Sequence, residues 1–175
     1  MTTLRRATAQ DVDWLVALYG DDDVDPFLGP RCPRDREAMG AEVARSLAEP
    51  ETFGRFVIEA GGERAGALGY HQVSEANRIV RLEGIAVHPG FRGRRLADEA
   101  ARLLQRYLLV DLGYHRLELT CYAFNERAIV HAERSGFVRE GLKRQAYLRH
   151  GVWQDAVEFA LLREDLEVED SGRGA

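Results

Sequence analysis

The clearest chemical potential in this chain lies at a strand–turn–helix junction, LEGIAVHPGFRGRRLADEAARLL, at positions 82–104. The strand there ends in three apolar residues, Ile85, Ala86 and Val87. After a turn at 88–90 the helix entry carries three arginines, Arg92, Arg94 and Arg95. The first turn of a helix leaves backbone N–H groups without intrahelical partners, and the helix dipole places partial positive charge there. The junction therefore predicts a site for an anion such as a phosphate or pyrophosphate.

Two common phosphate-binding loops do not account for this segment. It has neither the GK[ST] of a Walker A loop nor the GxGxxG of a dinucleotide-binding turn. On composition alone, the three arginines could equally be solvated charges at a helix entry. The spacing of proline, arginine and glycine is what favours a binding site.

That spacing resembles the acetyl-CoA-binding motif of the GCN5-related N-acetyltransferases, a V-x-P-x-x turn followed by [R/Q]-x-x-G-x-[G/A]. The matching residues are Val87, Pro89, Arg92, Gly93 and Ala97. Arg95 departs from the motif, because the family usually has glycine there, where backbone and pyrophosphate come close. An arginine would still offer its amide if its φ were helical and its side chain pointed away, and it could add a charge-assisted bond.

The resemblance covers nearly the whole chain. The run Asn125–Ile129 with Gly136-Phe137 and Glu140-Gly141 resembles the second block of the family, N-x-x-[AS]-I…GF…EG. The opening, Leu4–Thr8 with Asp11, also suits the family. The ending, Gly151–Asp155 with Leu161-Leu162, is similar to the ribosomal-protein and spermidine acetyltransferase branches.

The resemblance implies acetyl-CoA as acyl donor, bound where two parallel strands splay apart, here those ending at Val87 and near Cys121. The pantetheine would pair with the strand edge like an added strand, and the pyrophosphate would lie on helix-entry amides. The implied cofactor contacts are Ile85, Ala86, Val87, Arg92, Gly93, Arg94, Arg95, Leu96 and Ala97. Asn125 would also bond the cofactor; alternatively it is an N-cap whose side chain accepts from the amide of Arg127 or Ala128.

Acyl transfer to an amine needs a base, because an ammonium has no lone pair. Glu83 is the candidate: it lies four residues before Val87 on the same strand, so plain alternation puts both on one face. Partial burial would raise its pKa and suit it to this role. The alternative is a surface glutamate paired with Arg81 or Arg116. Glu118, on the next strand, is a lesser candidate.

The leaving thiolate needs a proton donor. Relatives in the family use a tyrosine seven residues after the asparagine or a serine three residues after it, but this chain has Ala132 and Ala128 there. Tyr147 is our candidate; the other substitutes are His131, Cys121 and Tyr122. Transfer could also proceed mainly by approximation of the amine and the thioester.

The acceptor pocket is expected between the N-terminal segments and the last hairpin. Asp21, Asp22, Asp23 and Asp25 would attract a cationic amine, unless they form a solvated acidic loop. The hairpin 145–153 carries Tyr147, His150 and Trp153, which could line a pocket or a homodimer contact.

Composition limits the function classes. The 175 residues carry a net charge of −5, which argues against nucleic acid as the main partner. The N-terminus has no apolar leader, and no stretch approaches 18 uninterrupted apolar residues, so we expect no membrane partner. Two distant cysteines make neither a metal site nor a disulfide framework and suit a cytoplasmic protein.

Periodicity and turn residues predict an alternation of strands and helices. Helices are expected at 11–19, 35–48, 95–110 and 125–135, with a loop at 20–34. Strands are expected at 3–7, 53–59, 64–72, 77–87, 117–121, 137–141 and 152–161. The fold class is therefore α/β, a single domain with a mixed, mostly antiparallel sheet, helices on both faces and, by the resemblance, a central splay. We expect the domain to span residues 1–166 and a disordered tail at 167–175.

These features favour an N-acetyltransferase acting on a primary amine of a small molecule, such as an amino acid, polyamine or antibiotic-like amine. One alternative is the same chemistry on a protein N-terminus or lysine. A second alternative, raised by the missing tyrosine and serine acids, is a non-catalytic CoA-binding module.

Overall fold

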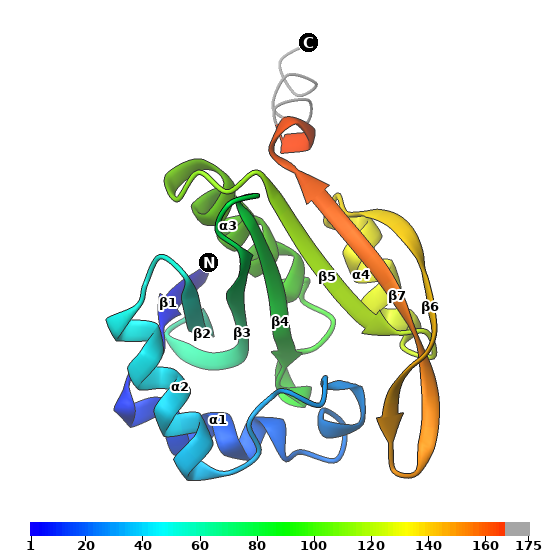
Figure 1. Cartoon of the computed structure of the whole chain (residues 1–175). Coiled ribbons are helices and arrows are strands. Elements are labelled where there is room, and N and C mark those ends of the chain that lie inside the picture. The colour runs from blue at the N-terminus through cyan, green and yellow to red at the C-terminus, as the bar shows by residue number, and fades with distance from the viewer. Residues whose placement is uncertain (167–175) are drawn as a thin grey trace. The chain divides into compact units, whose positions relative to one another are not determined.

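The computed structural model describes residues 1–166, which form two compact units (Figure 1). The first unit contains residues 1–71 and 82–103, and the second contains residues 72–81 and the chain from Leu104 onward. The predicted tail at 167–175 lies outside the described residues. Residues 1–166 contain four α-helices and seven strands, which confirms the mixed α/β class.

The first unit has its strands in the order β1-β2-β3-β4. Their full bounds are Thr2–Arg6 for β1, Phe53–Ala60 for β2, Glu63–Ser74 for β3 and Ile79–Val87 for β4. β1 and β2 pair antiparallel, as do β2 and β3, so this part of the predicted pattern is confirmed. The turn between β2 and β3 uses Gly61 and Gly62, both with positive φ, as the sequence indicates.

Two helices enclose the core of the first unit: α1, Val12–Tyr19, and α2, Arg36–Ala48. Asp35 caps α2 by accepting a hydrogen bond from the amide of Ala38 at 2.8 Å. Apolar side chains of both helices pack with Val57, Ala67 and Ala86 from β2, β3 and β4. This cluster fixes which face of the strands lies under α1 and α2.

The helix α3, Leu96–Arg106, follows the junction and continues as a π-helical segment, Tyr107–Asp111. The sequence predicts one helix over 95–110, so its extent is nearly right but its last turn is not α-helical. The second unit then contains β5 (Arg116–Tyr122), α4 (Glu126–Arg134), β6 (Val138–Arg149) and β7 (Val152–Leu162). Its strand order is β5-β7-β6, with both pairings antiparallel.

The strand β6 differs most from the sequence-based expectation. We predict a strand only over 137–141, but pairing with β7 continues to Arg149. β6 is exposed along most of its length, so it lacks the alternation of buried apolar residues that marks a half-buried strand. The tight turn at His150 and Gly151, both with positive φ, carries the pairing to the hairpin tip.

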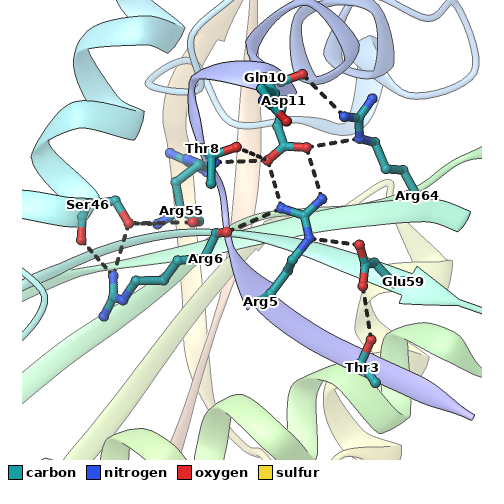
Figure 2. Close-up of polar contacts among 10 residues, drawn as sticks. All are labelled: Thr3, Arg5, Arg6, Thr8, Gln10, Asp11, Ser46, Arg55, Glu59 and Arg64. Carbon is teal, nitrogen blue, oxygen red and sulfur yellow. Dashed lines mark hydrogen bonds and ion pairs between the residues drawn. The ribbon is translucent and has the colours of Figure 1, made fainter. Parts of the chain in front are cut away.

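A buried carboxylate anchors the N-terminal strand to the rest of the first unit (Figure 2). Asp11 is 1% exposed and accepts two hydrogen bonds from the Arg5 guanidinium, at 2.7 and 3.0 Å. It also accepts from the amide and hydroxyl of Thr8, at 2.8 and 3.1 Å, and its carboxylate lies 2.9 Å from Nε of Arg64. These interactions, led by the hydrogen bond from Arg5, hold the pKa of Asp11 well below its usual range.

We predict that Asp11→Asn lowers the free energy of unfolding by about 2 kcal/mol at pH 7, because charge-assisted hydrogen bonds to a buried carboxylate are lost. The folded pKa is depressed, so this stabilisation is complete above the unfolded value of about 3.9 and is lost as the pH falls. Urea unfolding at pH 7 and pH 3 measures it, and the gap between variant and wild type should shrink at pH 3. Asp13→Asn, whose ion pair with Arg36 is exposed, is the matched control and should cost little. If both substitutions lowered the free energy of unfolding equally at pH 7, the stabilising role of the buried Asp11 carboxylate would be contradicted.

Among residues 1–166, no helix is both long and apolar enough to cross a membrane.

Candidate active site

The predicted anion site is a loop between β4 and α3 with an unusual backbone. A 3-10 turn at Pro89–Phe91 follows His88, whose Nδ1 accepts a hydrogen bond from the amide of Gly90 at 3.2 Å. Gly93 has a φ of +80°, and a Cβ built on it would meet no atom within 4 Å. The backbone at Gly93 is therefore open to a ligand, in a conformation that favours glycine.

Arg95 occupies the left-handed region, with a φ of +56°. The helical φ that would let an arginine at this position offer its amide is therefore absent. The helical hydrogen bonds begin after it, from the amides of Asp98 and Glu99 to the carbonyl of Arg95, at 3.1 and 3.2 Å. The amides of Leu96 and Ala97 thus precede this hydrogen-bond ladder, as the anion-site prediction requires. A glycine at position 95 would adopt this φ without steric cost.

The three arginines of the loop do not act alike. Arg92 donates from Nη2 to the backbone carbonyl of Asp23 at 2.9 Å, which ties the loop to the acidic segment after α1. The guanidinium of Arg94 lies over the ring of Phe91, 5.3 Å from its centroid. The side chain of Arg95 is exposed. The loop thus carries the predicted positive charge, and each of its three arginines has different surroundings.

These residues fit the phosphate groups of acetyl-CoA. Gly93 leaves the backbone approachable, the amides of Leu96 and Ala97 precede the helical ladder, and the loop carries three arginines. Backbone N–H groups at a helix entry are suitable donors to phosphate oxygens. Within residues 1–166, no group of three or more His, Cys, Asp and Glu side chains is placed to hold a metal ion.

Glu83 belongs to a buried polar cluster at the face of the strands that packs under α1 and α2. Its Oε1 lies 3.4 Å from Nη2 of Arg55, and its Oε2 lies 3.1 Å from Nδ1 of His71. The same Nη2 of Arg55 makes a short contact with the carboxylate of Glu42. The alternative interpretation, in which Glu83 pairs with Arg81 or Arg116, is therefore wrong. Those two arginines bind Glu118 instead.

Arg55 is fully buried and depends on two glycines for space. A Cβ at Gly69 would come within 2.8 Å of its Nη1, and a Cβ at Gly84 within 2.7 Å. Nη1 donates to the hydroxyl of Tyr19 at 3.1 Å, and this hydroxyl in turn donates to the carbonyl of Gly84 at 2.7 Å. The guanidinium thus connects α1, α2, β2 and β4 through direct hydrogen bonds and ion pairs.

Gly84 also changes the face on which Glu83 lies. With a φ of +63°, it interrupts the alternation of β4. Ala86 packs with Val57 on the α1 and α2 side, and Glu83 reaches Arg55, which lies two residues from Val57 on that same side. Glu83 therefore shares its face with Ala86. The expectation that it shares the face of Val87 is wrong, because the irregularity at Gly84 shifts the register of side chains.

The pKa of Glu83 is lowered, contrary to the expectation of a raised value. Burial by itself raises it, but the close contact with Nδ1 of His71 and the charges of Arg55 and Arg31 outweigh burial. Burial also raises the pKa of Tyr19 and of Cys32. Glu83 is therefore an ionised carboxylate at neutral pH, able to receive a proton, while the nearby Tyr19 hydroxyl and Cys32 thiol stay protonated.

In the second unit, Asn125 is the N-cap of α4. Its Oδ1 accepts a hydrogen bond from the amide of Ala128 at 3.1 Å, which confirms the capping interpretation. The cofactor contact predicted for Asn125 is compatible with this, because the side-chain amide nitrogen is not needed for the cap. Glu118 is held by Arg81 at 2.6 Å and by Arg116 at 3.1 Å. Burial raises the pKa of Glu118, but these hydrogen bonds outweigh burial, and its pKa is lowered overall. Two guanidinium groups thus already engage the second base candidate.

The candidate proton donors also lie in the second unit. Tyr147 lies edge-on to the ring of Tyr122, with centroids 5.8 Å apart, and Tyr122 stacks on Phe124 at 5.0 Å. Burial raises the pKa of Cys121 to about 11, so this thiol is protonated at neutral pH. His131 lies within α4. Of the candidate donors, Tyr122 and Tyr147 thus lie in one aromatic cluster, together with Phe124.

Sequence reasoning did not find Glu42, Arg55, His71 or Tyr19, because no motif marks them. Their arrangement depends on contacts between elements that are distant in the sequence. One signal was available: Arg55 is the charged residue inside an otherwise apolar strand, FGRFVI. A charge at such a position must be paired when the strand is buried.

Comparison with known proteins points in one direction. Residues 2–138 match the family model described as an acetyltransferase (GNAT) domain. An uncharacterized N-acetyltransferase of the SPbeta prophage of Bacillus subtilis is 31% identical over 136 residues, which is 78% of this chain and 76% of the relative. The spermidine N(1)-acetyltransferase of Escherichia coli is 28% identical over 69% of this chain, which spans 64% of that relative.

Solved structures give the same picture for the fold. A spermidine N-acetyltransferase chimera from Vibrio cholerae superimposes with a TM-score of 0.82 at 19% identity, covering 94% of this chain and 98% of that chain. A probable acetyltransferase of the GNAT family from Chromobacterium violaceum has a TM-score of 0.77 at 28% identity, covering 95% and 90%.

We predict that Arg95→Gly raises the free energy of unfolding by about 0.5–1 kcal/mol. The steric strain of a left-handed arginine that it removes is larger than the conformational entropy that glycine loses on folding. Since the side chain is exposed, CoA should bind equally well or tighter. Thermal unfolding and calorimetric titration with CoA at two salt concentrations measure both effects. Arg94→Gly, at a neighbouring position without positive φ, is the control and should destabilise. Weaker CoA binding by Arg95→Gly, most pronounced at low salt, would show instead that this guanidinium reaches a phosphate.

Proposed function

Because the chain belongs to the GNAT acetyltransferase family, we propose that it transfers an acetyl group from acetyl-CoA to a primary amine of a small molecule. The observation that carries this proposal is that the end of β4, the loop and most of α3, residues 82–103, form one continuous segment of the first unit. A buried, ionised carboxylate, Glu83, lies on the strand that leads directly into the open loop at Gly93 and the first amides of α3. One continuous segment thus carries a proton acceptor and an anion site.

In this proposal, acetyl-CoA supplies the thioester. The amides of residues 92–97 and the guanidinium groups of Arg92 and Arg94 bind its phosphates, and the backbone of Ile85, Ala86 and Val87 pairs with the pantetheine. Asn125 adds a contact from its amide nitrogen. These residues orient the donor, so that approximation of the amine and the thioester provides much of the rate acceleration.

Proton transfer completes the reaction. Glu83 accepts the proton of the acceptor ammonium, directly or through water, so that the nitrogen lone pair can form the new C–N bond. As the C–S bond breaks, the sulfur takes a proton, for which we propose the hydroxyl of Tyr147. Ala128 and Ala132 stand at the two positions where the family usually carries this donor.

The acceptor we propose is a cationic small amine. The Escherichia coli relative acts on spermidine according to its name, and the acidic segment at Asp21, Asp22, Asp23 and Asp25 would attract a positively charged molecule. Asp25 is ion-paired with Arg34 at 2.6 Å, and Nη1 of Arg92 lies 3.8 Å from the carboxylate of Asp23, so part of this charge is already balanced. A ribosomal-protein acceptor is the alternative, favoured by a relative named as a putative ribosomal N-acetyltransferase of Bacillus subtilis, 29% identical over 116 residues.

We also propose self-association through the β6–β7 hairpin. A related spermidine N-acetyltransferase from Vibrio cholerae is dodecameric. The hairpin exposes five large apolar side chains, each 47% exposed or more: Val138, Leu142, Leu148, Val152 and Trp153. Exposed apolar side chains of this kind are typical of an interaction surface.

Gly93→Asp should weaken acetyl-CoA binding by about tenfold or more, because a carboxylate at the loop repels phosphate and interferes with its charge-assisted hydrogen bonds. Isothermal titration calorimetry measures this. The matched control is Gly62→Asp in the β2–β3 turn, which has the same open surroundings and a positive φ. Equal affinity for the two variants would remove the cofactor from this loop.

Glu83→Gln should lower kcat/KM at neutral pH by about a hundredfold, with partial recovery at alkaline pH, where the amine is already neutral. The measurement is the pH profile of CoA release in steady state, with Glu118→Gln measured in parallel. A profile of Glu83→Gln that coincides with wild type at every pH would contradict the role of Glu83. A loss confined to Glu118→Gln would move the role to the second unit.

A further inference from the structure

We propose that Glu42 is a positioning residue, which engages Arg55 so that the carboxylate of Glu83 stays free to accept the proton of the amine. The proposal rests on the proposed function, in which Glu83 is the base. Nothing in the sequence motifs points to Glu42, which lies on α2, far from β4 in the chain.

The geometry behind this proposal is a single nitrogen shared by two carboxylates. Nη2 of Arg55 makes its short contact with Oε2 of Glu42, whereas Oε1 of Glu83 lies 3.4 Å away, at the long end of the hydrogen-bond range. Neither carboxylate takes the two-pronged arrangement that is strongest for arginine. Nε of Arg55 is buried and has no hydrogen-bond partner within the described part of the chain. The guanidinium thus favours Glu42 and holds Glu83 only loosely.

The preference of Arg55 for Glu42 affects the proton affinity of Glu83, because all three groups are charged. Arg55 is fully buried, and its one positive charge faces two carboxylates that are 24% and 17% exposed. If Glu42 were absent, the full charge of Arg55 would be available to Glu83. A carboxylate that alone pairs with a buried guanidinium is a weaker base, because the positive charge stabilises its ionised form and lowers its pKa. Glu42 therefore preserves the proton affinity of Glu83.

Other groups also act on Glu83, and each must be held constant in a test. The titratable and charged neighbours come from every element around it: Tyr19 of α1, Glu42 of α2, Arg55 of β2, His71 of β3, and Arg31 and Cys32 of the 20–34 loop. Of these, Glu42 can be neutralised with least disturbance, because its side chain is partly exposed and glutamine has nearly the same shape.

Substitution of Glu42 and substitution of Arg55, which carries the shared nitrogen, should have opposite effects on Glu83. Glu42→Gln removes the competing charge, so the midpoint of Glu83 titration should fall by about one pH unit. Arg55→Met removes the cation, so the midpoint should rise. A merely structural role would impair both variants without shifting the midpoint in opposite directions.

The test uses the full chain labelled with 13C at the glutamate carboxyl carbons and titrated by NMR without cofactor. The resonance of Glu83 is the one that disappears in Glu83→Gln. Glu37→Gln is the matched control, because Glu37 is exposed on the same helix and carries the same charge. The expected result is a lower midpoint in Glu42→Gln only, with kcat/KM at neutral pH reduced several-fold, and an unchanged midpoint in Glu37→Gln.

An unchanged or higher midpoint in Glu42→Gln would overturn the proposal, and this variant decides the matter alone if Arg55→Met does not fold. Failure of the proposed function gives a different result. In that case the midpoint falls in Glu42→Gln, but kcat/KM is unaffected both there and in Glu83→Gln. That outcome upholds the control of Glu83 by Glu42 and overturns its use in catalysis.

Discussion

The candidate base in the first unit depends on the burial of one guanidinium, that of Arg55. A buried arginine must be paired and hydrogen-bonded, or its desolvation is too costly. Here α1 supplies a hydroxyl, α2 a carboxylate and β4 a second carboxylate, while Gly69 and Gly84 provide the space. The same pairing gives Glu83 its position and its charge, so packing of the unit and chemistry of the candidate base have one physical origin.

Backbone irregularities then convert a regular strand and helix into a site. The positive φ at Gly84 turns Glu83 toward the arginine, and the positive φ values at Gly93 and Arg95 shape the loop before α3. Both irregularities lie on one continuous segment, so the position of the proposed proton acceptor and that of the proposed phosphate-binding amides are linked covalently. Strained or glycine-dependent backbone is often found where a ligand must approach closely.

The sequence could predict the local features and not the tertiary ones. The Gly61-Gly62 turn, the cap at Asn125 and the helix entry after Pro89 are encoded by neighbouring residues, and the structure contains all three. The face of Glu83 could not be predicted, because alternation holds only while the strand is regular and nothing adjacent to Gly84 reveals its φ. The lowered pKa of Glu83 depends on His71 and Arg55, which reach it only after folding. The left-handed Arg95 was hidden because its residue type argues against that conformation.

The central claim is acetyl transfer to an amine, and steady-state thiol release tests it most directly. Wild-type protein, acetyl-CoA and a panel of small amines, including diamines and polyamines, would be compared with a ribosomal-protein N-terminal peptide and with no acceptor. We expect CoA release that depends on a small cationic amine and matches the amount of N-acetylated product. Tight binding of acetyl-CoA, with no acceptor raising thiol release above background, would contradict it and identify a CoA-binding module without transferase activity.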